Sequence, residues 1–328
     1  MIMSPTPEQF KHIVAFEVSK AELVVHSLPG HAQKRIANSA TAVRRLLKQQ
    51  QERNHKQNLG PILVVCEATG GYERHVLDVA QALGLFLHRA HGSRTRFFAR
   101  YQGKLAKTDP IDARMLALFG ATTRDLPLYR AQSPQQQALR ALHKRRDELT
   151  AMLRMEINRR EHAILQSVKA SLARHIKLLE AECQALQEQI IALIQSTPEL
   201  RRKAGLMQTI KGVGPKTAAA CLAYLPELGT LSKAQAASLA GLAPIANDSG
   251  QHHGRRHIAG GRKSVRTCLY MAALVARSFN PRLKAFAQTL AQRGKPAKLV
   301  LTAIMRKLIV ILNAVIASGQ PALDIQRR

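Results

Sequence analysis

The feature that most constrains the fold is a run of six apolar residues, Pro61–Cys66, followed directly by an acid, Glu67. A strand that is apolar on both faces is typical of the centre of a sheet covered on both sides. A carboxylate that ends such a strand is costly to desolvate unless it holds a cation or a partner. The run therefore predicts an α/β domain with a candidate functional acid at the end of a central strand.

The residues around this strand predict the remainder of that domain. Two apolar segments separated by a four-residue turn form a hairpin, whose first strand ends at Glu17. A more polar third strand and two amphipathic helices complete the unit. The expected strands are His12–Glu17, Glu22–Leu28, Lys34–Ser39 and Leu85–His88, the expected helices are Ala40–Gln57 and Tyr72–Leu83, and a basic loop is expected at His91–Arg100.

A second acidic segment follows at Lys107-Thr108-Asp109-Pro110-Ile111-Asp112. Asp109 is predicted to cap a helix whose first residue is Pro110, because proline suits the first turn and biases the preceding residue away from helical angles. Asp112 then lies on the same side of the helix. The two carboxylates form either a cap with a partner for the helix dipole or half of a cation site.

Taken together, the acids occur in an order that an RNase H-like fold uses to hold two Mg²⁺ ions. They are Glu17 and Glu67 at strand ends, and Asp109 and Asp112 at the start of a helix. Hard divalent cations prefer carboxylate oxygens, and two ions can clamp the attacking and leaving oxygens of a phosphodiester. Each acid alone is better explained as a solvated cap or strand end, but the four acids together predict a metal site.

The charge of the chain indicates a polyanionic partner. It has 50 Lys and Arg against 21 Asp and Glu, a formal charge of +29, which favours a nucleic acid. Aromatic residues make up only 4%, and tryptophan is absent, so phosphate contacts should dominate over base stacking. The four cysteines lie far apart and are expected to be buried thiols in a reducing cytosol. The apolar run Leu299–Ile316 contains two adjacent cations, and we expect a buried helix rather than a membrane span.

Residues 133–196 predict two long helices. In the second half, apolar residues recur at alternating steps of four and three from Leu172 to Leu193, which is the a/d seam of a coiled coil. The first half is less regular and rich in arginine. The segment is either an antiparallel helical hairpin or a coiled coil that contacts another subunit, and an ordinary helix pair within a bundle is a further alternative.

Two segments of the last third have features of DNA contact. Ile210-Lys211-Gly212-Val213-Gly214-Pro215-Lys216 has the signature of a helix-hairpin-helix, in which glycines let the backbone approach a phosphate. A plain tight turn between core helices is the alternative. Downstream, Ser249-Gly250 lies in a predicted loop, Gly241–Gly250, followed by basic residues that include Arg255, Arg256, Arg262 and Lys263. A serine there has the ingredients of a phosphate nucleophile, although most loop serines are turn formers.

These motifs together resemble the DEDD transposases of insertion sequences, a family related to the pilin-gene invertase and now understood as RNA-guided serine recombinases. The resemblance covers almost the whole chain, from Ala15–Lys20 and Glu67–Gly70 through Lys107–Ala113 and Ile210–Pro215 to Gly241–Gly250. It implies a RuvC-like DEDD domain at 8–130, coiled-coil helices at 131–198 and a mostly helical transposase domain at 199–328. It also implies a structured non-coding RNA that pairs with donor and target DNA.

Carried over by position, Glu67, Asp109 and Asp112 match the second, third and fourth acids of the family, and Ser249 matches its catalytic serine. The family's first acid is usually aspartate, whereas this chain has Glu17. The expected enzyme is a Mg²⁺-dependent recombinase of the bacterial cytoplasm. It would act on double-stranded DNA as a homodimer or homotetramer, with contacts at Lys211, Gly212, Gly214, Lys216, Arg255, Arg256, Arg262 and Lys263.

Two other functions remain open from the sequence. The first is a RuvC-like junction nuclease in which water is the nucleophile and Ser249 is structural. The second is a nucleic-acid-binding scaffold without activity, in which Glu17 marks a decayed site. If Ser249 is not the nucleophile, Tyr270 and Ser264 are the next candidates.

Overall fold

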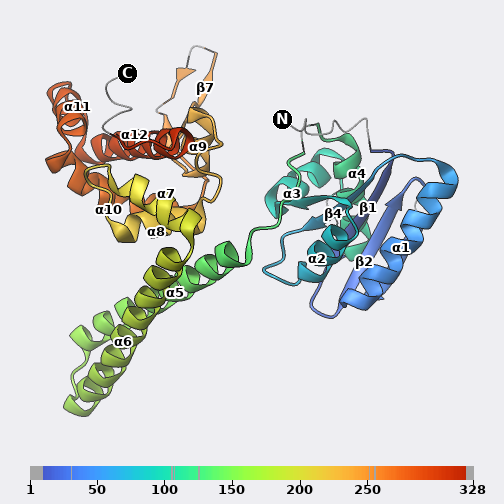
Figure 1. Ribbon diagram of the computed structural model, residues 1–328, viewed down its shortest axis with the longest axis horizontal. Coiled ribbons are helices and arrows are strands. Elements are labelled where there is room, and N and C mark those ends of the chain that lie inside the picture. Colours follow the sequence, from blue (N-terminus) through green and yellow to red (C-terminus); the bar gives the residue numbers. More distant parts are fainter. Residues whose placement is uncertain are drawn as a thin grey trace. The chain divides into compact units, whose positions relative to one another are not determined.

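The computed structural model describes residues 10–30, 32–104, 106, 108–124, 126–250, 252–254 and 256–322. The chain forms two compact units, Met1–Ala131 and Gln132–Arg328, and each is described by itself (Figure 1). The first unit is α/β, and the second is almost entirely helical.

The first unit has a five-stranded mixed sheet in the order β3-β2-β1-β4-β5. The first three strands are antiparallel neighbours, whereas β1, β4 and β5 run parallel. The strands are β1 His12–Val18, β2 Glu22–Leu28, β3 Ala32–Ala37, β4 Ile62–Glu67 and β5 Phe86–Ala90, and the helices are α1 Ala40–Gln57, α2 Arg74–Ala82, α3 Gly92–Tyr101 and α4 Asp109–Thr122.

Alternation along β1 and β4 divides the core of this unit into two layers. Phe16 and Cys66 point to the layer that contains α1 and α2, whereas Ala15 and Val65 point to the layer that contains α4. On the second face, a Cβ on Gly120 of α4 would collide with the side chain of Val65, so glycine permits α4 to lie close to the sheet. The apolar pattern of β4 is thus explained by cover on both faces, as its sequence predicted.

Two local predictions in this unit are wrong. Residues 91–100 were expected as a basic loop but form most of helix α3. Few side chains of this helix face the core: Thr95 is buried, and Phe98 packs on Phe119 with their ring centroids 5.5 Å apart. Because so few positions of α3 need an apolar residue, its sequence has no clear apolar period of a helix. Thr108, not Asp109, is the N-cap of α4, and Asp109 is its first helical residue.

The second unit begins with two long helices, α5 Pro134–His162 and α6 Gln166–Ser196. They are joined by three residues and pack against each other as an antiparallel hairpin. Of the predicted seam on α6, Ile176, Leu179 and Ile190 are buried. The hairpin alternative for this segment is therefore the one that the structure shows.

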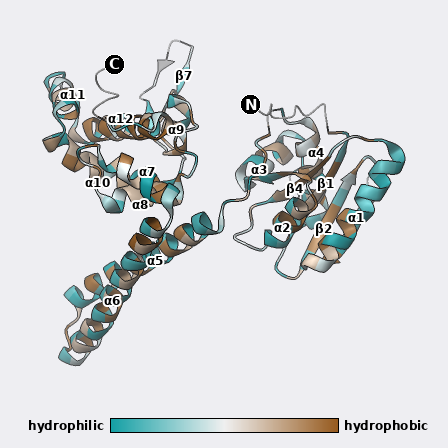
Figure 2. Ribbon diagram, viewed as in Figure 1, coloured by the Kyte–Doolittle hydropathy of each residue, from teal (hydrophilic) through white to brown (hydrophobic). Residues whose placement is uncertain are grey.

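The remainder of the unit is a helical domain with one continuous core. Its last helix, α12, is long and apolar enough to cross a membrane, but ten of its side chains are buried inside the domain, as expected for a core helix. Figure 2 shows the apolar character of α12 among its neighbours. The helices are α7 Pro198–Gln208, α8 Pro215–Tyr224, α9 Lys233–Leu239, α10 Lys263–Phe279, α11 Pro281–Gln292 and α12 Ala297–Ser318.

Candidate active site and nucleic-acid surface

Two of the predicted acids are neighbours at the carboxyl end of the sheet. Phe16 of β1 pairs with Cys66 of β4 in parallel register, so Glu17 and Glu67, one residue further along each strand, lie side by side. Adjacent strands are about 4.8 Å apart, and both side chains have the parity of the face covered by α4. Each residue is partly exposed. This places two carboxylates at one edge of the sheet, within reach of solvent.

Helix α3 holds the carboxylate of Glu67 in place. The single proton of the Thr95 hydroxyl is shared between two acceptors, Oε2 of Glu67 at 3.1 Å and the carbonyl oxygen of Gly92 at 3.0 Å. Gly92 opens α3, and a Cβ at this position would collide with Oε1 of Glu67. The start of a helix also favours negative charge. Gly92 and Thr95 were not predicted from the sequence, since their role depends on the path of a segment that was expected to be a loop.

Asp109 and Asp112 both lie in the first turn of α4, on the face of the sheet that also carries Glu17 and Glu67. Asp109 is exposed, and Asp112 is partly buried. Within the described ranges, no group of three or more His, Cys, Asp or Glu is arranged to hold a metal ion. The Glu17–Glu67 pair has the oxygen ligands that a hard divalent cation prefers. A joint site that includes Asp109 and Asp112 stays a prediction.

A further carboxylate, Glu73, organises the loop between Glu67 and α2. Its Oε2 accepts hydrogen bonds from the Thr69 backbone and hydroxyl and from the Gly71 N–H, and its Oε1 pairs with Arg89 of β5. Burial opposes ionisation, but the hydrogen bonds and the Arg89 charge outweigh it and lower the pKa of Glu73. The sequence signal for this role was an acid, Glu73, that follows Gly70 and Gly71 at the start of a helix. This role was not predicted from the sequence.

Ser249 lies on a small β-hairpin rather than in an irregular loop. Strand β7 (Asp248–Ser249) pairs with β8 (His252–His253), and Ser249 is opposite His252. Gly250 has φ +55°, the left-handed conformation that a tight hairpin turn needs and that glycine adopts without strain. A second pair, β6 (Pro244–Ile245) with β9 (His257–Ile258), forms the base. Two-residue strands leave no sequence pattern, so this hairpin could not have been predicted.

The side chain of Ser249 is exposed at this hairpin. The exposed Arg256 lies between β8 and β9, and Lys263 is exposed at the start of α10. Of the alternative nucleophiles, Tyr270 on α10 is exposed, whereas Ser264 is partly buried. Arg255, predicted as a DNA contact, lies outside the described residues.

Arg262 has a structural partner. Its guanidinium donates two hydrogen bonds of 2.6 Å to Glu227 and one of 2.8 Å to the Tyr224 carbonyl. Burial acts to raise the pKa of Glu227, but the hydrogen bonds from Arg262 and its charge outweigh burial, so that the pKa is lowered. A bidentate pair of this kind fixes the chain between the serine hairpin and α10. The geometry favours this role for Arg262 over the predicted DNA contact.

The segment between α7 and α8 contains the four predicted DNA contacts of the helix-hairpin-helix motif. Gly212 has φ +104°, and a Cβ there would collide with the backbone of Ala276 on α10. Gly214 precedes α8, with open space around its Cβ position, and Lys211 and Lys216 are exposed. Gly212 therefore serves packing, while Gly214 and the two lysines form the accessible part of the turn.

Comparison with known proteins identifies the family of the chain. Residues 18–169 match the DEDD-type IS110 transposase domain, and residues 204–288 match the family described as "Transposase IS116/IS110/IS902 family". The chain is 33% identical over 280 residues to a pilin gene-inverting protein of Moraxella lacunata, covering 81% of this chain and 84% of that protein. It belongs to the IS110 transposase family. A pilin gene-inverting protein of Moraxella bovis matches to the same extent.

Membership in the IS110 family establishes the general activity. The chain is a transposase or recombinase of an insertion sequence, and its partner is DNA. The DEDD type also indicates a divalent-metal cofactor.

Proposed function

We propose that this IS110 transposase cuts and rejoins DNA through a covalent phosphoserine intermediate. The observation that carries the proposal is Ser249, an exposed residue at a tight hairpin turn, followed along the chain by the exposed cations Arg256 and Lys263. Ser249 Oγ forms a bond to phosphorus, the bond from phosphorus to the 3′-oxygen breaks, and that oxygen leaves as a 3′-hydroxyl. The reverse attack reseals the strand without net input of energy.

The carboxylates of the first unit provide the metal site in this proposal. Glu17 and Glu67 would hold Mg²⁺, joined by Asp109 and Asp112 from α4. When bound, the metal supplies polarisation of the scissile phosphate oxygens. Thr95 and Gly92 keep the Glu67 carboxylate at the sheet edge. The strand order and directions of the sheet support an RNase H-like, RuvC-like domain.

A bound structured RNA would choose the donor and target sequences by base pairing, as the family resemblance implies. The scarcity of aromatic residues fits a protein that delegates sequence choice in this way. Lys211, Gly214, Lys216, Arg256 and Lys263 would contact phosphates, and the α7–α8 turn would act as a helix-hairpin-helix.

The enzyme would work as a homodimer or homotetramer. Exposed apolar side chains on both helices of the α5–α6 hairpin support a subunit contact there, because burial in an interface would remove their apolar surface from water. They include Met152, Met155, Leu178 and Ile191, with exposed fractions of 42, 50, 59 and 43%. Joining a carboxylate site from one subunit to a serine from another gives the oligomer a role in catalysis.

The decisive experiment is Ser249→Ala, with Ser238→Ala as the matched control, because Ser238 is an exposed serine of α9 in the same unit. Each variant is incubated with labelled donor DNA, and covalent protein–DNA adducts are resolved on denaturing gels. Ser249→Ala should abolish the adduct and leave RNA binding intact, whereas Ser238→Ala should form it normally. An adduct that persists in Ser249→Ala refutes the assignment.

The second candidate is a RuvC-like nuclease in which water is the nucleophile. The adjacent Glu17–Glu67 pair and the DEDD family favour it, because both point to metal-dependent hydrolysis. In that case Glu67→Gln would abolish cleavage, Ser249→Ala would retain it, and no adduct would form with the unmodified chain.

A further inference from the structure

The second unit contains a pocket away from the serine hairpin, lined by residues of α10, α11, α12 and the turn between the last two helices. Its volume is about 410 Å³. On α11, Lys284, Ala287, Gln288 and Ala291 are spaced by three and four residues, so they share the helix face that lines it. Two of these four are alanines. Their short side chains leave the hollow open between the helices.

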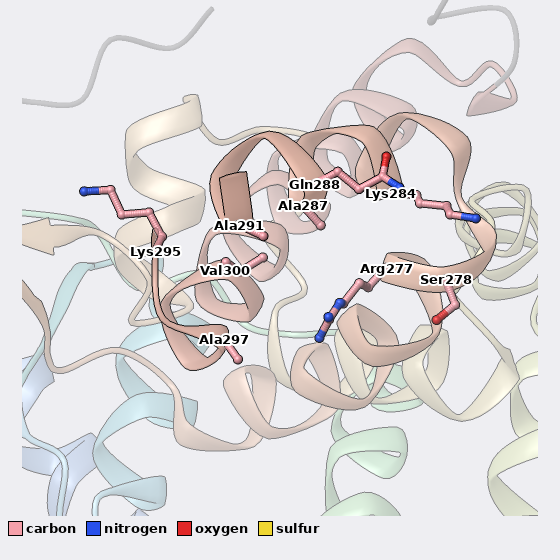
Figure 3. Close-up of a pocket in the computed structure, with 9 residues that line it drawn as sticks. All are labelled: Arg277, Ser278, Lys284, Ala287, Gln288, Ala291, Lys295, Ala297 and Val300. Atoms are coloured by element: carbon pink, nitrogen blue, oxygen red, sulfur yellow. The ribbon is translucent and has the colours of Figure 1, made fainter. Parts of the chain in front are cut away.

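The floor of the pocket is apolar. Ala287 and Val300 are 6 and 4% exposed, and Ala291 continues the same surface outward. Figure 3 shows these three side chains together on the inner side of the pocket. An apolar floor of this size suits a flat or compact organic group, since a lone inorganic anion would leave the floor without a partner.

The rim of the pocket is cationic. Arg277 of α10, Lys284 of α11 and Lys295 of the α11–α12 turn are exposed and line it from different elements. Figure 3 shows Arg277 reaching toward the hollow, while the amino groups of Lys284 and Lys295 extend outward on opposite sides of it. Residues 263–318 contain ten Lys or Arg and no Asp or Glu. Among the residues that the structure describes, none of these three cations forms an ion pair. The rim therefore presents positive charge that the neighbouring helices do not neutralise.

An apolar floor between separated cations matches one nucleotide, in which the apolar face of the base and the carbon atoms of the sugar lie between two charged phosphates. In a duplex the bases are stacked inside, so a duplex would reach the rim and leave the floor empty. An unpaired nucleotide exposes both parts at once. Gln288 and Ser278 line the same pocket and supply polar groups for base or sugar.

We propose that this pocket binds one nucleotide of an unpaired DNA strand, with the base or sugar on the Ala287–Ala291–Val300 floor and the flanking phosphates at Arg277, Lys284 and Lys295. The proposal rests on the DNA partner that family membership establishes, not on which group is the nucleophile. It assigns α10–α12 a role in holding a strand that is separated from its complement. Without an aromatic side chain in its lining, the pocket is expected to accept any base.

The first test removes the rim charges. Binding of the full chain to a fluorescent 12-nucleotide single-stranded DNA is followed by anisotropy over a salt series. The variant Arg277→Gln/Lys284→Gln/Lys295→Gln is compared with Lys169→Gln/Arg174→Gln/Lys177→Gln, which removes the same charge from exposed positions of α6. The pocket variant should bind at least tenfold more weakly than the control. The magnitude of its slope of log affinity against log salt should fall by about 1.4, because the two flanking phosphates contribute about 0.7 each.

The second test fills the hollow without changing charge. Ala291→Leu extends the exposed end of the floor into the pocket, and Ala170→Leu is the same change at an exposed position of α6. Only Ala291→Leu should weaken single-strand binding about tenfold, with duplex binding unchanged. Circular dichroism is used to check that each variant folds. If the triple variant does not fold, the proposal is tested by the single-strand affinity of Ala291→Leu compared with that of Ala170→Leu.

The proposal is overturned by equal losses in pocket and control variants, by a loss of duplex binding in Ala291→Leu equal to its loss of single-strand binding, or by a larger loss for a single-stranded RNA of the same sequence. Ser249→Ala should bind the single strand normally in either case. Adduct formation therefore tests the serine mechanism, and single-strand binding tests the pocket independently of it.

Discussion

The Tyr224 hydroxyl donates a hydrogen bond of 2.8 Å to Oδ2 of Asp147, joining α8 to α5. Asp147 also pairs with Arg146, which donates to Gln187 of α6, while the Tyr224 carbonyl accepts from Arg262. A continuous set of polar contacts thus connects the helical hairpin to the residue that precedes α10 and follows the serine hairpin. Tyr224 is the residue through which α5 and the segment after the serine hairpin are joined.

Tyr224→Phe should lower the free energy of unfolding of the second unit by about 1 kcal/mol, the usual net value of one hydrogen bond. The loss stays small because Asp147 is partly exposed and can be hydrated instead. Urea unfolding followed by circular dichroism measures the change. Tyr270→Phe is the control, since Tyr270 is exposed on α10. Equal stability of the two variants would show that the Tyr224–Asp147 bond contributes nothing.

His143 should make the second unit sensitive to acid. It is fully buried beside Tyr224, and burial, followed by the charge of Arg146, lowers the pKa of His143 to about 4. An unfolded histidine titrates near 6.5, so the unfolded chain binds the proton first and stability falls as the pH drops from about 6.5 to about 4. The expected loss at pH 4 is about 3 kcal/mol.

His143→Leu should remove that part of the pH dependence, as measured by urea unfolding at pH 7, 5.5 and 4.5. His162→Gln, at an exposed position of α5, should leave it unchanged. A pH profile of His143→Leu that matches the parent would mean that another group causes the acid sensitivity.

The two glycines of the α7–α8 turn should respond differently to alanine. Gly212→Ala forces a Cβ into the backbone of Ala276 at a positive φ, and a loss of stability of about 2 kcal/mol or more is expected. Gly214→Ala meets open space at an ordinary φ and should leave stability unchanged. If the turn contacts phosphate, Gly214→Ala should still weaken duplex binding. Melting curves and DNA-binding assays on both variants separate the two roles, and equal melting temperatures would contradict the packing role of Gly212.

The sequence predicted the fold best where apolar residues follow a clear pattern. The strand around Val64 was found because it is buried on both faces and is therefore apolar throughout. The helix that begins at Ala40 was found because its buried face gives apolar residues at helical spacing. Helix α3 was missed because Thr95 is its single buried residue. The Ser249 hairpin was missed because each of its strands has two residues, too few to show alternation.

The site was predictable only in part, for a related reason. An acid at the end of an apolar strand can be recognised from the strand alone, and the parallel pairing of β1 with β4 then brings Glu17 beside Glu67. The contacts of Thr95 with Glu67 and of Arg262 with Glu227 join residues 28 and 35 positions apart. No local pattern encodes such pairs, because they depend on how the elements pack.

The neighbouring cations Arg262 and Lys263 at the start of α10 should differ in role, the first contributing to stability and the second to DNA binding. Arg262→Gln breaks the bidentate contact with Glu227 and should destabilise the second unit by about 1 kcal/mol, a modest value because both side chains are partly exposed. Lys263→Gln should keep the stability and weaken duplex binding, with a salt slope smaller by about 1. Unfolding and anisotropy measurements on both variants test this. A normal melting curve for Arg262→Gln together with weak DNA binding would instead restore Arg262 as a DNA contact.

Gly92 offers a test of the carboxylate site that leaves every acid in place. In Gly92→Ala the new Cβ displaces the Glu67 carboxylate from the edge of the sheet, because it would occupy the position of Oε1. If Glu67 holds the metal, cleavage of donor DNA should fall at least tenfold, and raising the Mg²⁺ concentration should recover part of it. DNA binding should not change. Gly205→Ala is the matched control, since this glycine of α7 has open space around its Cβ position. Full cleavage by Gly92→Ala would show that the position of Glu67 at this edge does not matter for the reaction.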